Sequence, residues 1–193
     1  PSSVSDYPFE VAVNQRETTT GGLSGYESSD FLWAKAEGKT SADRIVWLNF
    51  AHRMAGVKVS LEQGSGFAEG EWDAAGKDVL IRNTSRKASI DFSTGSVTVT
   101  GEPEYKGIIP QDEGSVFRAV VVPQTVGAGQ VLITVTVGGY SYDLVRQLDM
   151  VYVGGKQHNF TLTVNKRTGG DYEFELAEQS ISDWENDRNS HEG

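Results

Sequence analysis

The chain has no cysteine and few histidines. Its 193 residues include three histidines and no cysteine, so disulfide bonds and cysteine-ligated zinc sites are excluded. A chain of this length buries roughly 70% of the surface that its unfolded form exposes, so it folds without such crosslinks. The length fits one large domain or two small ones. The redox compartment is not defined, because a cysteine-free chain folds equally well inside or outside a cell.

Positive charge and long apolar segments are also scarce. The 17 basic and 27 acidic residues give a net charge of −10, which argues against nucleic acid as a partner and against a polybasic membrane anchor. The longest strongly apolar stretch is residues 119–122, far below the roughly 18 residues that span a bilayer. Residues 1–4 lack the features of a signal peptide, so we expect a processed or trimmed product.

Catalytic motifs are missing. The sequence has no nucleophile elbow, no P-loop, no paired zinc-binding histidine motif and no dinucleotide fingerprint, so we predict neither an enzyme nor a cofactor. His52 lies between apolar strand segments. It is either a general base or metal ligand, or a polar residue at a strand end that bonds a backbone carbonyl; the second interpretation is favoured because no other ligand lies nearby in sequence.

Alternation of apolar and polar residues dominates the chain and predicts β-strands. It is clearest in residues 57–61, 96–100, 131–137, 159–165 and 171–176. Glycine pairs separate the strands: Gly138-Gly139 predicts a two-residue hairpin, and Gly154-Gly155 predicts another. The pattern is typical of an all-β protein, an antiparallel β-sandwich.

Two segments carry unusual apolar residues. Residues 44–54 are apolar on both faces, which predicts a central strand buried on two sides, and we expect Trp33 and Trp47 to lie in the core. Trp72 stands between turn glycines, and we expect it to be exposed as a candidate ligand-binding residue that stacks on sugars.

The chain divides into three parts. Residues 1–30 form a linker or first strand and a polar loop, residues 31–167 the β-sandwich domain, and residues 168–193 a C-terminal strand and acidic tail. An extended segment with alternating apolar residues fills a sheet edge by strand addition. The C-terminal part is therefore either a donor strand for another subunit or an ordinary strand of its own sandwich. The residues at issue are Tyr172, Phe174, Leu176, Ile181 and Trp184.

The acidic tail also resembles part of a calcium loop. Asp183, Glu185 and Asp187 alternate as oxygen ligands do. Arg188 stands where a calcium loop needs glycine, and no glutamate follows at the twelfth position. A solvated acidic tail is favoured, and we predict no metal site.

Several motifs, in order, resemble the fimbrillin family, the pilins and accessory fimbrial proteins of Bacteroidales. They are S-D-F-L-W-A (29–34), V-W-L-N-F-A-H-R-M-A-G-V-K-V-S-L (46–61), the V-P-Q strand and following hairpin (119–142), G-G-K-Q-H-N-F-T-L-T-V-N-K (154–166) and I-S-D-W (181–184). Gly56 stands where the family often has lysine.

The resemblance implies a transthyretin-like β-sandwich, here the C-terminal fimbrillin domain with the N-terminal domain absent. It implies export as a lipoprotein to the outer membrane of a Gram-negative bacterium, and a place in cell-surface fimbriae that support adhesion. Its implied partners are other fimbrial subunits, as homopolymer or accessory pilins, joined by strand exchange. Host or bacterial surface glycans or proteins are further partners. A carbohydrate-binding tip adhesin or surface lipoprotein on the same scaffold is the alternative.

Overall fold

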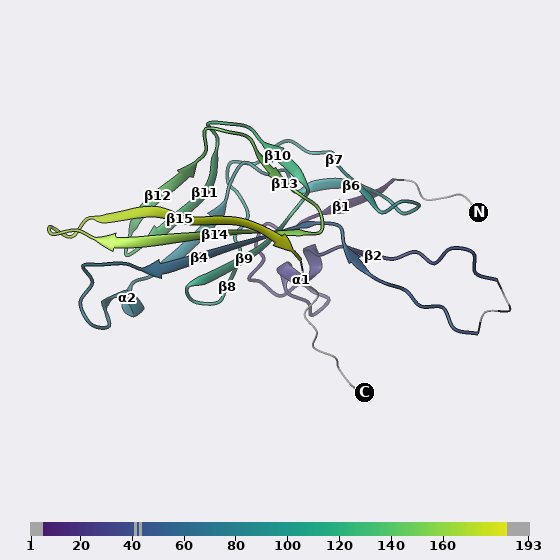
Figure 1. Cartoon of the computed structure of the whole chain (residues 1–193), viewed down its shortest axis with the longest axis horizontal. Helices are drawn as coiled ribbons and strands as arrows, with labels where there is room; N and C mark the ends of the chain where they lie inside the picture. Colours follow the sequence, from purple (N-terminus) through teal and green to yellow (C-terminus); the bar gives the residue numbers. More distant parts are fainter. Residues whose placement is uncertain (1–5, 41, 43, 185–193) are drawn as a thin grey trace.

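The computed structural model describes residues 6–40, 42 and 44–184 (Figure 1). Within these residues the chain forms many strands and two short helices. In chain order these are β1 (Tyr7–Glu10), α1 (Gly25–Ser29), β2 (Leu32–Trp33), β3 (Ala51–His52), β4 (Ala55–Gln63), α2 (Glu71–Ala74), β5 (Lys77–Ile81), β6 (Lys87–Asp91), β7 (Ser96–Val99), β8 (Gln111–Asp112), β9 (Val116–Val121), β10 (Gln124–Val126), β11 (Val131–Val137), β12 (Tyr140–Val145), β13 (Met150–Tyr152), β14 (Lys156–Lys166) and β15 (Tyr172–Asp183).

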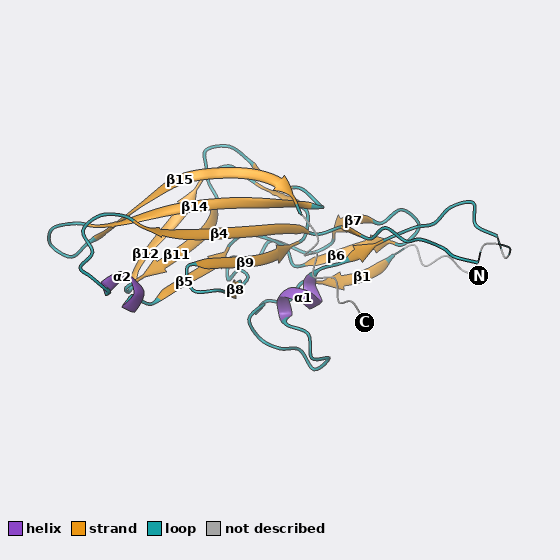
Figure 2. Cartoon of the chain, turned by 60° about the horizontal axis from the view of Figure 1, so that its bottom comes forward, coloured by secondary structure: helices purple, strands orange, loops and turns teal. Residues whose placement is uncertain are grey.

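Two sheets face each other and form a β-sandwich, which confirms the predicted fold class (Figure 2). One sheet has the order β15-β14-β4-β9-β8, and the other has the order β12-β11-β5. The neighbours in both sheets run antiparallel, apart from β14 and β4, which are parallel. Side chains from both inner faces form one core, with Val59 and Phe160 from the first sheet and Ile133 and Val135 from the second. Each such buried side chain stabilises the fold by roughly 1.5–3 kcal/mol.

The predicted alternation and one predicted hairpin are confirmed. Along β14, Phe160, Leu162 and Val164 are buried while the residues between them are half-buried. Gly138 and Gly139 join β11 to β12 with φ angles of 58° and 88°. Two consecutive positive φ angles are what a tight hairpin turn requires, and glycine adopts them without a steric penalty.

The second predicted hairpin, at Gly154-Gly155, is wrong. The strand before it, β13, pairs with β10, whereas β14 pairs with β4 and β15. The two glycines instead permit close contact with the segment that precedes β4. A Cβ atom on Gly154 would lie 2.7 Å from the carbonyl oxygen of Arg53, and the Gly155 N–H donates to the carbonyl of Met54 at 2.8 Å.

The N-terminal part is integrated into the body. β1 pairs with β6 in the sheet β1-β6-β7. The polar loop predicted within residues 1–30 contains the short helix α1, which begins with a capping box: the Glu27 N–H donates to the Ser24 hydroxyl, and the Ser24 N–H donates to the Glu27 carboxylate. Among the described residues, no helix has the length and apolar character needed to cross a bilayer.

A buried side chain substitutes for a missing strand beside β9. Gln15 is fully buried, and its amide oxygen accepts from the Val120 N–H at 2.8 Å while its amide nitrogen donates to the Val120 carbonyl at 2.7 Å. β8, the neighbour of β9 on this side, pairs only with Phe117 and Arg118. The Gln15 amide therefore satisfies backbone groups that β8 is too short to reach.

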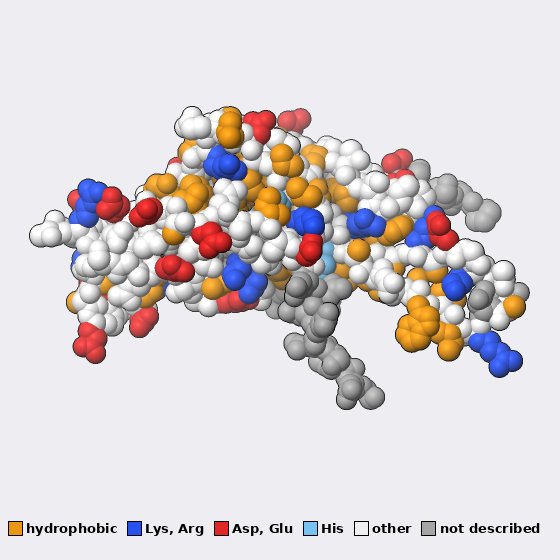
Figure 3. All heavy atoms as spheres, viewed as in Figure 1, with side chains coloured by type: hydrophobic (Ala, Val, Ile, Leu, Met, Phe, Trp, Pro, Cys, Tyr) orange, Lys and Arg blue, Asp and Glu red, His pale blue; other side chains and the backbone are white. Residues whose placement is uncertain are grey.

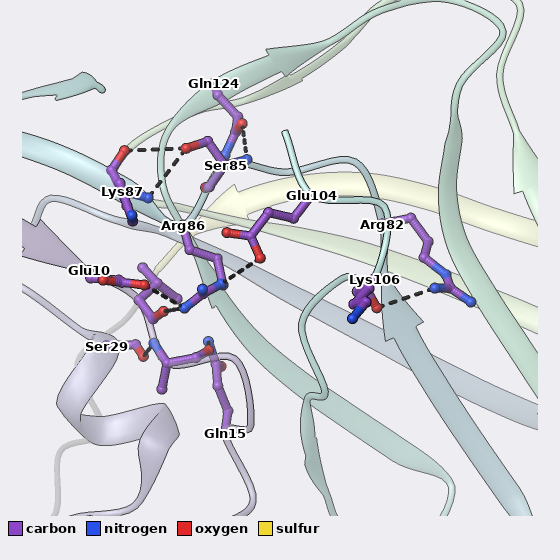
Figure 4. Close-up of polar contacts among 12 residues, drawn as sticks. Glu10, Gln15, Ser29, Arg82, Ser85, Arg86, Lys87, Glu104, Lys106 and Gln124 are labelled. Atoms are coloured by element: carbon purple, nitrogen blue, oxygen red, sulfur yellow. Dashed lines mark hydrogen bonds and ion pairs between the residues drawn. The ribbon is translucent and has the colours of Figure 1, made fainter. Parts of the chain in front are cut away.

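Arg86 ties the N-terminal strand to the middle of the chain (Figure 4). Its guanidinium forms ion pairs with Glu10 at 2.9 Å and Glu104 at 3.1 Å, and it donates to the carbonyl of Val11 at 3.0 Å. Close by, the Gln124 side chain accepts from the Ser85 N–H at 2.8 Å and donates to the Ser85 carbonyl at 2.9 Å. These contacts hold the β1-β6-β7 sheet against the sandwich.

The predicted central strand at residues 44–54 is wrong over most of its length. Residues 34–50 lie between β2 and β3 in the sequence, and we call them the arm. Its described residues, 34–40, 42 and 44–50, project from the body (Figure 1). Trp47, expected in the core, is 82% exposed. Trp33 is half-buried at the base of the arm, where the Arg53 guanidinium lies 4.5 Å from the ring centroid and the indole N–H donates to the Phe92 carbonyl at 3.0 Å. The sequence pattern identified a segment that needs burial on both faces, but no element within the described residues covers it.

Candidate functional site

The C-terminal strand β15 holds most of the residues predicted for polymerisation. It pairs antiparallel with β14 from Tyr172, opposite Lys166, to Asp183, opposite Lys156. The structure thus shows the internal pairing that the sequence left open for this segment. Phe174 and Leu176 point into the sandwich, and the Phe174 ring stacks on Tyr142 of β12 with centroids 5.4 Å apart.

β15 is the last strand of its sheet, so its outer edge has no strand partner within the described residues. Its inward-facing side chains are incompletely covered there. Phe174 and Leu176 are only half-buried, and Ile181 is 55% exposed. A twelve-residue edge of this kind presents unpaired backbone groups to an incoming strand.

Apolar side chains of β13 extend this uncovered region. The Gln179 amide of β15 lies 3.5 Å from the sulfur of Met150, which places β13 beside β15. Val151 and Val153 are 51% and 40% exposed. We call Val151, Val153 and Ile181 the ledge. Exposed apolar side chains on the open edge strand, Ile181 first among them, favour the addition of a further strand there.

Tyr172 anchors the beginning of β15. Its ring stacks on Phe67 with centroids 5.5 Å apart and meets Tyr140 edge-on at 4.8 Å. Arg167 forms an ion pair with Glu173 next to it, and this hydrogen bond lowers the pKa of the Glu173 carboxyl. The turn between β14 and β15 is therefore held by aromatic and charged contacts on both sides.

Trp184 anchors the other end of β15. Its indole stacks on the His52 imidazole, and its backbone N–H donates to the Gly155 carbonyl at 3.2 Å. A Cβ atom on Gly56 would lie 3.2 Å from the indole. The glycine that departs from the family pattern is therefore the residue that makes room for Trp184.

His52 has a carboxylate partner, where the sequence suggested a backbone carbonyl. Its Nδ1 lies 2.8 Å from an Asp30 oxygen, and its Nε2 is buried with no hydrogen-bond partner in the described chain. Both residues line a groove of ≈ 740 Å³ that Tyr26, Phe50 and Trp184 also border. Within the described residues no group of three or more metal-ligating side chains occurs.

Trp72 is not exposed, so its predicted role as a sugar-stacking residue is wrong. It lies in α2 and is 7% exposed. Phe67 meets its ring edge-on at 5.3 Å, and the Lys77 ammonium lies 4.4 Å from its centroid. Lys77 also donates to the Trp72 carbonyl at 2.6 Å. The flanking glycines suggested an open turn, but they instead allow α2 to fold its indole onto the core.

The calcium candidates are only partly within the described residues. Asp183 is ion-paired with Lys156, and that hydrogen bond lowers the pKa of the Asp183 carboxyl. Glu185 and Asp187 lie outside the described residues. Asp183 thus fastens β15 to β14.

No match was found among curated proteins. Two solved structures share the fold. One, described as a candidate cell adhesion protein of Bacteroides uniformis, is 22% identical with a TM-score of 0.65, over 94% of this chain and 66% of its own. The other, so described from Bacteroides ovatus, is 17% identical with a TM-score of 0.66, over 96% of this chain and 63% of its own. The chain therefore spans slightly less than two thirds of the length of these structures.

The family comparison agrees with the fold and with the ordered motifs. The fimbrillin-like family model matches residues 2–184, nearly the whole sequence. It confirms the resemblance seen in the sequence, including the segments around Gly56 and Trp184. The chain belongs to the fimbrillin-like family.

Proposed function

We propose that the chain is a structural subunit of cell-surface fimbriae that associates with other fimbrial subunits through β-strand pairing at β15. Fimbrillin-like proteins are structural rather than enzymatic. The observation that carries the proposal is the open edge of β15, with its ledge of exposed apolar residues. Strand addition at such an edge joins subunits by backbone hydrogen bonds and by side chains that enter alternate positions.

In the exchange form of this proposal, β15 itself is the donor. Tyr172, Phe174, Leu176, Ile181 and Trp184 would leave their own sheet and fill the corresponding place in a neighbouring subunit. Most of these side chains already occupy alternate inward positions, which a recipient groove would require. The stacked pair of Trp184 and His52 is then the contact that must open first.

Fimbrial function places the protein at the cell surface, on the outer membrane of a Gram-negative bacterium, in a complex that supports adhesion. The adhesion descriptions of the two solved structures support this location. The chain covers less than two thirds of those structures, so the partners of the whole protein, whether homopolymer, accessory pilins or surface lipoproteins, belong to this proposal.

Carbohydrate binding, as in a tip adhesin, is a second candidate function. The observation that favours it is the groove beside Trp184, where aromatic rings lie among the polar side chains of Gln111, Arg118 and Gln157. Saccharides bind where ring faces and hydrogen-bonding groups combine in this way. Glycan-array screening of the native protein tests it, and a flat profile contradicts it.

Replacement of one ledge residue tests assembly at β15. Ile181→Lys places a charge where the added strand would lie, and because Ile181 is 55% exposed the subunit itself should fold normally. We expect SDS-resistant multimers from the producing cells to fall at least tenfold. Val145→Lys is the matched control, at a 40% exposed position on β12, the edge strand of the opposite sheet. Equal multimer yields from the two variants would contradict the proposal.

A further inference from the structure

The arm is the most exposed apolar segment of the described chain. The exposed fractions are 67% for Ile45, 45% for Val46, 82% for Trp47, 47% for Leu48 and 53% for Phe50. Figure 3 shows apolar side chains gathered where the arm projects. A contiguous run of this kind is a hallmark of an interaction surface, whereas single exposed apolar residues are ordinary.

Both faces of this run carry apolar side chains that a partner would bury. In an extended chain successive side chains point to opposite sides, so Ile45 and Trp47 lie on one face and Val46, Leu48 and Phe50 on the other. No strand pairing is present over the described residues between β2 and β3. The segment therefore lacks both side-chain cover and backbone partners, and one strand-like neighbour would supply both.

The arm is directed away from its own body. At its base Leu32 pairs with His52 and Trp33 with Ala51, and the contacts of Trp33 with Arg53 and Phe92 fix that end. In Figure 1 the arm projects at one end of the molecule, and the turn between β14 and β15 lies at the opposite end. Cover for the arm therefore comes from outside the described part of its own chain.

We propose that residues 45–50 of the arm add as a further strand to the β15 edge of a second copy of this chain. This inference rests on the proposed assembly at β15, and it names the segment that is added. Ile181 offers an exposed apolar side chain on the strand with which the incoming segment would pair. Six extended residues reach roughly 20 Å, which β15, with twelve residues, accommodates.

Charge also favours this pairing. β15 carries four acidic residues and no basic one; Glu173 and Asp183 are ion-paired with Arg167 and Lys156, which leaves Glu175 and Glu178. The arm has three basic residues against two acidic ones, and Lys35 is paired with Glu37 within it. The rest of the molecule is strongly acidic, since the net charge of the whole chain is −10. An arm with a small positive balance is the part of the molecule best suited to approach the edge of another copy.

The resulting contact is head-to-tail. The arm lies at one end and the acceptor edge extends toward the other (Figure 1), so each copy has one arm to give and one edge to offer. Repeated contacts of this type extend into an open filament when the rotation between copies does not close a ring. In this arrangement β15 stays paired with β14, which distinguishes it from exchange of β15 itself.

The 193 residues contain no cysteine, so a crosslink that requires both introduced cysteines identifies the two positions. The native full-length protein is expressed on its own cells with Leu48→Cys and Ala177→Cys together, and the cells are treated with a mild oxidant or a short bismaleimide. Both positions are exposed, so substitution should not disturb folding. We expect a covalent ladder under denaturing conditions, removed by reductant in the disulfide case. The control pairs Leu48→Cys with Tyr105→Cys and should give no ladder. Tyr105 is 59% exposed and contacts Arg82 at the end of β5, an edge strand of the opposite sheet.

The outcomes separate the two proposals. Fimbriae that form normally without a Leu48–Ala177 crosslink would overturn the role of the arm and leave assembly at β15 standing. A crosslink confined to one polypeptide would also overturn it. Lack of multimers in the unmodified protein would contradict the proposed function itself.

A second variant tests the role of the arm through multimer yield instead of crosslinking. Trp47→Asp should leave the unfolding midpoint of the isolated subunit unchanged, because the side chain is 82% exposed, and should lower multimer yield at least tenfold. Trp47→Phe, which keeps an apolar ring, should restore assembly. Wild-type multimer yield from Trp47→Asp would overturn the inference.

Discussion

The indole of Trp184 lies parallel to the imidazole of His52, with ring centroids 4.3 Å apart and an interplanar angle of 8°. The contact joins the end of β15 to β3, which is the base of the arm. Asp30 holds the imidazole from the other side through Nδ1. The two regions that we propose to take part in assembly, β15 and the arm, therefore meet at this pair of rings.

Gly56→Val should displace Trp184. A side chain at this position begins with a Cβ only 3.2 Å from the indole, and overpacking of this kind destabilises by about 1–3 kcal/mol. Valine otherwise suits a strand, so a loss of stability would report the indole contact. Urea unfolding and near-ultraviolet circular dichroism measure it. Gly76→Val is the control, because a Cβ there meets nothing within 4 Å; equal effects at both sites would contradict the packing account.

Trp72 and Trp47 should respond in opposite ways to replacement by alanine. Trp72 is 7% exposed and Trp47 is 82% exposed. Removal of a buried tryptophan costs about 3–5 kcal/mol, whereas surface substitutions stay within about 0.5 kcal/mol. Urea unfolding of the two variants provides the comparison. A fully stable Trp72→Ala variant would show that the indole is not part of the core.

Gln15→Met should destabilise the fold by about 1–3 kcal/mol, because the N–H and carbonyl of Val120 lose their partners in a buried position. Methionine keeps the size of the side chain, so the change isolates the hydrogen bonds. Gln130→Met is the control at an exposed position. Hydrogen exchange of the Val120 amide gives a second readout, and unchanged protection would argue against the role of Gln15.

Stability should fall as the pH is lowered from neutral through the range where histidine titrates. His158 is fully buried, and its Nε2 accepts from the Val153 N–H at 2.9 Å. Burial lowers the pKa of His158, so the unfolded chain binds the proton more readily than the folded one. The stabilising contribution is complete above the unfolded pKa of about 6.5 and is lost as the pH falls through the lower folded pKa.

His158→Gln tests this pH dependence. The glutamine oxygen can accept the Val153 N–H but does not titrate, so the loss of stability between pH 7.5 and 5.5 should be smaller in the variant than in the wild type. Urea titrations at several pH values measure the difference. Identical slopes in the two proteins would contradict the assignment.

Several strands and one of the two predicted hairpin turns could be predicted because their signals are local. Alternation in β14 and the pair Gly138-Gly139 each act within a few residues, and both are confirmed. The family motifs also have a physical basis in the structure. Gln124, the last residue of V-P-Q, bonds both backbone groups of Ser85.

The predictions that are wrong concern residues whose placement depends on partners distant in the sequence. The apolar pattern of residues 44–50 predicts burial without indicating which element covers them, and within this chain none of the described elements does. The predicted exposure of Trp72 is wrong because the flanking glycines permit a short buried helix as readily as an exposed turn. The structural roles of Gln15 and Asp30 could not be predicted from neighbouring residues, because their partners Val120 and His52 lie far away in the sequence.

The most direct test of the central claim uses surface extracts of the producing cells, kept unheated in SDS, resolved by electrophoresis and probed with an antibody against this domain. Negative-stain microscopy of the same material accompanies it. Assembly at β15 predicts a ladder of SDS-resistant multimers with filaments for the wild type, and their loss in Ile181→Lys but not in Val145→Lys. A single monomer band without filaments in the wild type would contradict the account.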